Sequence, residues 1–272
     1  MNYKEVAERL HTLDRAHNNF AKGKNPPQLS RVTEISERME NILFPSFFPI
    51  SSDDTAPIEE LLAELFVLIR DELAALLVGN RPSSENIAKD IISSLPKVKE
   101  MLINDALAIY KGDPAAHSIY EIILCYPGFF AIMSYRLARL FYIRQVPYLP
   151  RMMTERAHRL TGIDIHPGAE IGESFCIDHG TGIVIGETAT VGDRVKIYQG
   201  VTIGAKSFVP DGMGGVVKGK KRHPDIGDDC VIYAGATILG GDTVIGNGCV
   251  IGGNVWLTHS VPPGQRIYYN EK

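Results

Sequence analysis

The chain has 272 residues, of which 44% are hydrophobic, and a formal net charge of −4. This length suits one or two domains with a sizeable core, and the single short basic cluster at 218–223 argues against nucleic-acid binding. Charged side chains recur within the most apolar segment, 58–78, which argues against a membrane span. The charged residues that follow Met1 leave no apolar core for a signal peptide, so we expect a cytoplasmic protein.

Apolar residues recur at the spacing of amphipathic helices through the first part of the chain. Helices are predicted over four segments: 58–78, 83–95, 129–143 and 150–162. We expect Pro96 to end or kink the second of these helices and Gly162 to close the last. The stretch 44–57, rich in Pro and Ser, is predicted to be a connection. Together these features predict an all-helical domain over residues 1–161.

The apolar period changes to six after Gly162. The aliphatic residues on this grid are Ile165, Ile171, Ile177, Ile185, Val191, Ile197, Ile203, Ile226, Ile232, Ile238, Ile245 and Ile251. Glycine follows seven of them, and such a repeat predicts a parallel β-helix, in which each hexapeptide forms one strand and one corner. A β-sandwich would instead alternate with a period of two. We therefore predict a β-helix domain over 162–264 and a short C-terminal tail over 265–272.

The six-residue grid breaks at three places. Two residues are inserted around 179–183, the segment 205–224 leaves the grid, and one residue is added within 239–246. The segment 205–224 is predicted to be an excluded loop, and long loops on a rigid scaffold tend to carry function. The first break places an acid and a histidine side by side, Asp178 and His179, which an ordinary core strand does not need.

Four cysteines, Cys125, Cys176, Cys230 and Cys249, lie far apart and form no CxxC pair. We expect reduced thiols rather than a disulfide or zinc framework. No cluster of metal-ligating residue types stands out in the sequence, so we expect no metal. Cys176 is close to His179 but lies on the repeat, and we interpret it as a packed thiol rather than a nucleophile.

Four short blocks occur in order along the chain: DPAA at 113–116, DIHPG at 164–168, DHGTG at 178–182 and RHP at 222–224. A hexapeptide repeat alone also occurs in acyltransferases that modify sugars, antibiotics and lipids, but this combination closely resembles the serine O-acetyltransferases over residues 100–261. The resemblance implies a left-handed parallel β-helix after the helical domain, an association of three subunits and an active site in the groove between neighbours. It also implies acetyl transfer from acetyl-CoA to L-serine, the first step of cysteine biosynthesis from serine.

The resemblance also assigns roles to individual residues. His179 corresponds to the general base of the family, and Asp164 corresponds to the carboxylate that orients this base. The residues implied to bind the amino acid are Asp113, Asp178, Arg222 and His223. The residues implied to line the slot for the co-substrate acetyl-CoA are Gly204, Ala205 and Ala234.

These residue types suit acetyl transfer to a zwitterionic alcohol. A neutral histidine, with an ordinary pKa of about 6.5, can take the hydroxyl proton and return it in the same cycle. A carboxylate on the far ring nitrogen fixes the tautomer of that histidine. Arg222 offers a planar fork for a carboxylate, while Asp113 and Asp178 can receive an ammonium, an opposed pair that a sugar does not need. We expect direct transfer in a ternary complex, without an acyl-enzyme.

The sequence departs from the family at two places. The excluded loop is longer than in the common bacterial enzymes, and the chain lacks the C-terminal tail ending in Ile by which the family docks into O-acetylserine sulfhydrylase. We therefore predict no stable complex with that enzyme. The N-terminal helices also diverge from the family, so we predict a homotrimer, with the hexamer of paired trimers common in bacteria as the alternative. Cysteine has the same zwitterion as serine, so we expect it to act as a feedback inhibitor at the serine site.

Two other interpretations of the sequence stay open. The same scaffold can acetylate another small hydroxyl acceptor such as a sugar, and a β-helix can serve as a non-catalytic assembly or regulatory subunit. The opposed charges of Asp113 and Arg222 disfavour the sugar acceptor. An intact pair of His179 and Asp164 disfavours the non-catalytic subunit.

Overall fold

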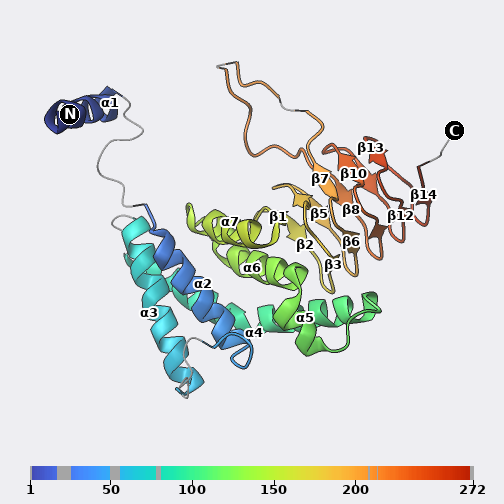
Figure 1. Ribbon diagram of the computed structural model, residues 1–272, viewed down its shortest axis with the longest axis horizontal. Coiled ribbons are helices and arrows are strands. Elements are labelled where there is room, and N and C mark those ends of the chain that lie inside the picture. Colours follow the sequence, from blue (N-terminus) through green and yellow to red (C-terminus); the bar gives the residue numbers. More distant parts are fainter. Residues whose placement is uncertain are drawn as a thin grey trace.

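The computed structural model describes residues 2–16, 26–49, 56–77, 81–207, 209–212 and 214–269. Helices make up the N-terminal part of the molecule and short strands the C-terminal part (Figure 1). The helices are α1 (Tyr3–Ala16), α2 (Leu29–Leu43), α3 (Ile58–Leu76), α4 (Arg81–Gly112), α5 (Ile119–Cys125), α6 (Pro127–Tyr142) and α7 (Leu149–Thr161). The strands are β1 (Asp164–Ile165), β2 (Glu170–Ile171), β3 (Cys176–Asp178), β4 (Val184–Ile185), β5 (Thr190–Val191), β6 (Lys196–Tyr198), β7 (Thr202–Gly204), β8 (Asp225–Ile226), β9 (Val231–Ile232), β10 (Thr237–Leu239), β11 (Val244–Ile245), β12 (Val250–Ile251), β13 (Trp256–Leu257) and β14 (Arg266–Ile267).

The predicted helical half is confirmed, with one correction at Pro96. Helices α3, α6 and α7 lie over the segments that the periodicity indicates, and Gly162 closes α7 with a φ of 70°. Helix α4 runs through Pro96, so of the two expected effects of this proline, an end or a kink, the helix end is wrong. The helix continues because Leu95 and Val98, one on each side of the proline, are buried, and their packing offsets the backbone hydrogen bond that the proline ring removes.

The C-terminal half is a parallel β-helix, as the six-residue grid predicts. Its strands form three parallel sheets with the orders β1-β4-β7-β10-β13, β11-β8-β5-β2 and β14-β12-β9-β6-β3, and the chain enters the next sheet at each corner (Figure 1). All twelve aliphatic residues of the grid are buried. They stack because strands of successive coils pair in register, for example Ile185 with Ile203. This inward stack forms the core of the domain.

A buried ion pair joins the helical half to the first coil of the β-helix. The Arg136 guanidinium of α6 makes two hydrogen bonds to the Asp105 carboxylate of α4, at 2.6 and 2.8 Å. Arg136 also donates to the Gly172 carbonyl at 2.7 Å, and Asp105 accepts the Phe175 backbone N–H at 2.9 Å. Both residues of the pair therefore reach the backbone of the β2–β3 connection. Two domains that meet through buried, mutually satisfied charges have a defined relative orientation.

The segment 205–224 leaves the β-helix between β7 and β8 and projects from it (Figure 1). Its two arms run antiparallel, with a bridge between Pro210 and Val216 and a backbone hydrogen bond of 2.8 Å from Val217 to Val209. At the other end of the chain, β14 lies inside the segment 265–272 and pairs with β12. The last coil of the β-helix therefore includes residues that the sequence pattern places in a tail.

All four cysteines have free thiols in the structure, and three of them are buried. Among the described residues, no helix combines the length and apolarity needed to cross a membrane.

Candidate active site

His179 lies at the corner between β3 and β4, where the grid gains two residues. Asp178 of β3 is in register with Tyr198 in the next coil, but the residue that stacks on Gly200 is Gly182 rather than residue 180. The corner therefore takes four residue steps where the next coil takes two. The extra backbone projects outward, with a φ of 58° at His179 and a side chain that is 73% exposed. Non-glycine residues adopt such a φ rarely, but in this β-helix it recurs at regular corners, for example at Arg194 and Asp229.

Two carboxylates lie beside His179. Asp178 Oδ1 is 3.7 Å from His179 Nε2. Asp113 follows the end of α4, and its carboxylate accepts hydrogen bonds from the Tyr126 hydroxyl at 2.6 Å and the Ala115 backbone N–H at 2.8 Å. These two hydrogen bonds lower the pKa of Asp113, with a smaller contribution from the positive charge of Lys196. The structure thus brings three of the predicted site residues together around an ionised acidic centre.

Lys196 of β6 completes this cluster. Its ammonium donates to the Gly112 carbonyl at 2.6 Å and lies 2.9 Å from Asp178 Oδ2. It also lies 4.5 Å from the centre of the Tyr198 ring, a cation–π contact. Burial works against the charged ammonium, but hydrogen bonds to Tyr198 and Asp178 outweigh it and raise the pKa of Lys196. The lysine is therefore a permanent positive charge at this site.

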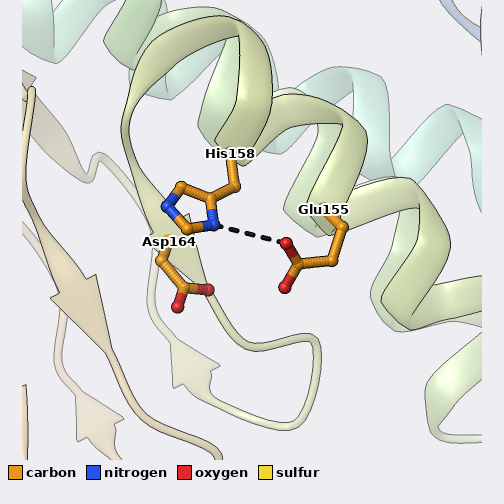
Figure 2. A group of neighbouring side chains, drawn as sticks. All are labelled: Glu155, His158 and Asp164. Atoms are coloured by element: carbon orange, nitrogen blue, oxygen red, sulfur yellow. Dashed lines mark hydrogen bonds and ion pairs between the residues drawn. The ribbon is translucent and has the colours of Figure 1, made fainter.

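Asp164 of β1 faces the last turns of α7 rather than the ring of His179. Figure 2 shows its carboxylate beside Glu155 and His158, with an ion pair of 3.3 Å between His158 Nδ1 and Glu155 Oε2. The Arg151 guanidinium lies 3.4 Å from Asp164 Oδ1 and 2.5 Å from Glu155 Oε1. Within the described residues, no hydrogen bond or ion pair joins Asp164 to His179.

The cluster around Asp164 contains three groups that can ligate a cation. Glu155, His158 and Asp164 each offer one ligand atom, and these atoms lie within 4.8 Å of one another. Arg151 already supplies a positive charge to both carboxylates of the cluster. Ion pairing therefore accounts for this arrangement of acids without a further cation.

Arg222 and His223 lie at a different corner of the β-helix. Arg222 Nη2 is 2.6 Å from Glu187 Oε2, and the other oxygen of Glu187 accepts a hydrogen bond of 3.0 Å from the Tyr142 hydroxyl. His223 Nδ1 accepts the Thr188 backbone N–H at 3.0 Å. Glu187 and Thr188 stand at the corner between β4 and β5, so the end of the excluded loop is fixed to that corner. The charge of Arg222 is held in one place by a carboxylate that is itself anchored.

Burial controls the protonation of the histidines at this second corner. Burial and the positive charge of Arg222 lower the pKa of His223 to about 4. Burial and Arg151 likewise lower the pKa of His166, whose ring meets the Tyr142 ring edge-on with centroids 5.7 Å apart. For Glu187, burial is outweighed by hydrogen bonds from Arg222 and Tyr142, which lower its pKa. This corner therefore combines neutral histidines with an ionised carboxylate and guanidinium at neutral pH.

The residues predicted to line the acetyl-CoA slot divide between the same two edges of the β-helix. Gly204 ends β7 and Ala205 follows it, on the edge that carries Arg222. Ala234 follows β9, on the edge that carries His179, and its carbonyl accepts the Asn254 backbone N–H at 2.9 Å. Among the described residues, no hydrogen bond or ion pair joins the His179 group to the Arg222 group. One chain thus carries two separate groups of predicted site residues, the candidate half-sites.

Sequence reasoning missed three side chains of these half-sites: Tyr126, Glu187 and Lys196. Tyr126 and Glu187 lie within residues 100–261, the part of the chain that resembles the family. Their hydrogen-bond partners lie at least 13 positions away in sequence. Lys196 is separated from Gly112 by 84 positions. Lys196 directly precedes the inward-facing Ile197 in a short strand. Any outward-facing position of a β-helix strand permits a charged residue, so the local sequence does not single out this lysine.

Comparison with known proteins found relatives that match this chain. The family model described as "Serine acetyltransferase, N-terminal" matches residues 58–134. A Synechococcus elongatus protein named "Serine acetyltransferase, plasmid" is 57% identical over 184 residues, which cover 68% of this chain and 57% of that protein. The chain therefore matches less than two thirds of the length of this relative.

Solved structures match over a larger share of both chains. Entamoeba histolytica serine acetyltransferase 1, in complex with L-cysteine, is 39% identical with a TM-score of 0.77, covering 87% of this chain and 86% of that chain. Neisseria gonorrhoeae serine acetyltransferase, in complex with serine, is 27% identical with a TM-score of 0.59, covering 89% of this chain and 95% of that chain. The chain belongs to the serine acetyltransferases, a family of acyltransferases.

Proposed function

We propose that the protein transfers the acetyl group of acetyl-CoA to the hydroxyl of L-serine, forming O-acetyl-L-serine and CoA. The observation that carries this proposal is the opposed charge of the two half-sites, acidic around His179 and cationic at Arg222. Such a pair complements the ammonium and carboxylate of one amino acid. The Neisseria relative in complex with serine and the Entamoeba relative in complex with L-cysteine support an amino-acid ligand.

In the proposed reaction, His179 acts as general base in a direct transfer. It takes the proton of the serine hydroxyl as the oxygen attacks the thioester carbonyl, so an O–H bond breaks and an O–C bond forms. The tetrahedral intermediate then expels the thiolate, which receives the proton back from His179. The exposure of His179 on its projecting corner leaves the ring accessible to both substrates. Burial raises the pKa of the nearby Cys176 thiol to about 12, which argues against an acyl-enzyme on that sulfur.

For the carboxylate that orients His179 we propose Asp164, as the family resemblance implies. In the structure Asp164 pairs with Arg151, whereas Asp178 is the acid within 3.7 Å of the His179 ring. The two carboxylates can be distinguished by exchanging each for asparagine. Loss of kcat in Asp164→Asn supports the orienting role, because serine affinity depends on Asp178 and Asp113 instead.

The acceptor is proposed to bind with its ammonium at Asp113 and Asp178 and its carboxylate at Arg222 and His223. The lowered pKa of Asp113 keeps that group ionised when the ammonium arrives. Glu187 holds one edge of the Arg222 guanidinium, which leaves the remaining N–H groups for the substrate carboxylate. Cysteine presents the same two charged groups, so we propose that it competes with serine here.

Because the two half-sites stand on different edges of one chain, we propose that the complete site forms between neighbouring chains of a homotrimer. The edge with His179 and Ala234 of one chain then faces the edge with Arg222, Gly204 and Ala205 of the next. Acetyl-CoA would lie along this groove. On this proposal residues 162–264 form the acyltransferase domain, and residues 1–161 supply Asp113 and contacts between subunits.

One assay tests the proposal against its alternatives. Release of free thiol from acetyl-CoA is measured with L-serine, with candidate sugars and without an acceptor. Thiol release that requires L-serine supports the proposed function. Release only with a sugar indicates another acceptor, and no release with any acceptor indicates a non-catalytic β-helix.

A further inference from the structure

We propose that Lys196 is a positioning residue of the acceptor site, which fixes Asp178 and Asp113 relative to each other and limits the negative charge beside His179. The resemblance to the family gives this lysine no role. The inference rests on the proposed function, since it concerns how the amino-acid acceptor and the general base share one acidic centre.

The position of Lys196 joins two segments that are distant in sequence. Gly112 is the last residue of α4, and Asp113 follows it directly. The Lys196 ammonium donates to the Gly112 carbonyl at 2.6 Å and so binds the C-terminal end of that helix, which carries the negative end of the helix dipole. The same ammonium lies 2.9 Å from Asp178 Oδ2. One side chain thereby ties the loop with Asp113 to the strand with Asp178.

The contact also selects which oxygen of Asp178 faces the acceptor. Lys196 engages Oδ2, and Oδ1 is the oxygen 3.7 Å from His179 Nε2. The side chains of Lys196 and Asp178 are only 17% and 11% exposed, so little water competes for this ion pair. The Tyr198 ring, 4.5 Å from the ammonium, adds a cation–π contact to the lysine. The carboxylate is therefore held in one rotamer before any substrate binds.

The positive charge of Lys196 offsets part of the negative charge beside the proposed general base, His179. The charged groups near His179 are Asp178 on the same corner, Asp113 after α4 and Lys196 of β6, and their charges sum to minus one. A single ammonium on the acceptor neutralises that sum. Without the lysine, two uncompensated carboxylates would stabilise the imidazolium form of His179, which cannot accept a proton. The lysine thereby offsets one of the two negative charges beside the proposed base.

The test is the pH profile of kcat/KM for L-serine in the full chain. Lys196→Met removes the charge and keeps the apolar stem, Lys196→Arg keeps the charge, and Lys97→Met removes a lysine whose ion pairs with Glu173 and Glu100 lie on the exposed face of α4. We expect the acid limb of the Lys196→Met profile to move up by about half to one pH unit, with activity recovering on the alkaline side. KM for serine should stay level or fall, because the site then attracts the ammonium more strongly. Lys196→Arg and Lys97→Met should keep the parent profile.

Two results would overturn the inference while the parent is active with serine. One is a Lys196→Met profile within about 0.2 pH unit of the parent. The other is a loss of kcat/KM that is equal at every pH, because it would show that the charge of Lys196 does not act on His179. Should Lys196→Met not fold, Lys196→Gln keeps an amide donor for Gly112 without the charge and enters the same comparison. A parent that is inactive with serine overturns the proposed function, and the inference falls with it.

Discussion

The exposure of His179 at the β3–β4 corner depends on two residues inserted into the six-residue repeat. Two inserted residues lift His179 out of the stack, and the ring becomes 73% exposed while its neighbour Asp178 stays buried. The insertion therefore explains why an acid and a histidine are adjacent in a sequence whose aliphatic residues otherwise recur every six positions.

Removing the proposed base should affect turnover rather than binding. We expect His179→Ala to lower kcat by roughly 10²–10⁴, about 2.7–5.4 kcal/mol of barrier, with little change in the affinity for acetyl-CoA. Steady-state kinetics and direct binding of CoA measure the two effects. His11→Ala, at an exposed histidine of α1, is the control. Activity of His179→Ala within about tenfold of the parent would rule out the role of base.

The buried imidazole of His223 should make stability depend on pH. Its pKa in the folded chain is lowered to about 4, below the value of about 6.5 in an unfolded chain, so the unfolded chain binds a proton that the folded chain does not. This contribution to stability is complete above about pH 6.5 and is lost as the pH falls towards 4. Between pH 7 and 5 we expect Tm of the parent to fall by about 2–4 °C more than Tm of His223→Asn. Parallel Tm curves for the two proteins would contradict this account.

Two features hold secondary-structure elements in place around the β3–β4 corner: a glycine at the corner itself, and a buried ion pair between the helical half and the β-helix. Gly180 has a φ of 97°, and a Cβ placed there would lie 2.5 Å from Ile163 Cδ1. The inserted corner is therefore compact on its inner side even though His179 projects outward. On the other side of the first coil, Arg136 and Asp105 anchor α6 and α4 to the β2–β3 connection. Both devices hold the His179 corner in place relative to Asp113.

The inserted corner should not tolerate a side chain at position 180. Gly180→Ala adds both an unfavourable φ and a steric clash, so we expect a loss of about 1–3 kcal/mol in the free energy of unfolding. Gly248→Ala is the matched control, because Gly248 also has a positive φ, 69°, but has open space around its Cβ position. Urea denaturation compares the two variants. Equal losses would show that the contact with Ile163 contributes nothing.

The ion pair between Arg136 and Asp105 should be costly to break from one side. The side chains are 4% and 0% exposed, so Arg136→Met leaves a buried carboxylate without its counter-charge. We expect a loss of about 3–5 kcal/mol in the free energy of unfolding. The double variant Arg136→Met with Asp105→Asn should recover part of this loss, because no uncompensated charge remains. Urea denaturation of both variants measures the difference, and a double variant no more stable than the single one would contradict the explanation.

For the molecule as a whole, the proposed function places activity in an assembly of chains. His179 and Ala234 stand on one edge of the β-helix, and Arg222, Gly204 and Ala205 stand on another. A closed ring of three identical chains brings each edge against the other edge of a neighbour. Catalysis in such an assembly requires residues from two chains at every site.

Mixing two inactive variants tests this arrangement. His179→Ala and Arg222→Ala are each expected to be nearly inactive with serine at ordinary concentrations. When the two are unfolded together and refolded, random trimers should regain about a quarter of the parent activity, because some interfaces then join an intact His179 to an intact Arg222. Each variant refolded alone is the control. No regain in refolded, trimeric mixtures would show that one chain supplies the whole site.

The β-helix and the positions where it is interrupted are predicted from the sequence alone. A period of six aliphatic residues is a local pattern, and each repeat needs only its neighbours in the stack, so the grid could be read without knowledge of distant contacts. The sequence also predicted the residues of both candidate half-sites, through blocks that lie close to the corners. It failed at Pro96, where packing on both sides of the proline keeps α4 continuous.

The way in which the helical half meets the β-helix could not be predicted from the sequence. The contact of Lys196 with Gly112 and the pairing of Asp164 with Arg151 depend on how α4 and α7 lie on the first coils. No local pattern encodes these contacts, because a charged side chain suits any outward position of a strand or helix. They form when packing of the two apolar cores brings segments together that lie far apart in sequence, and that packing sets the charges around His179.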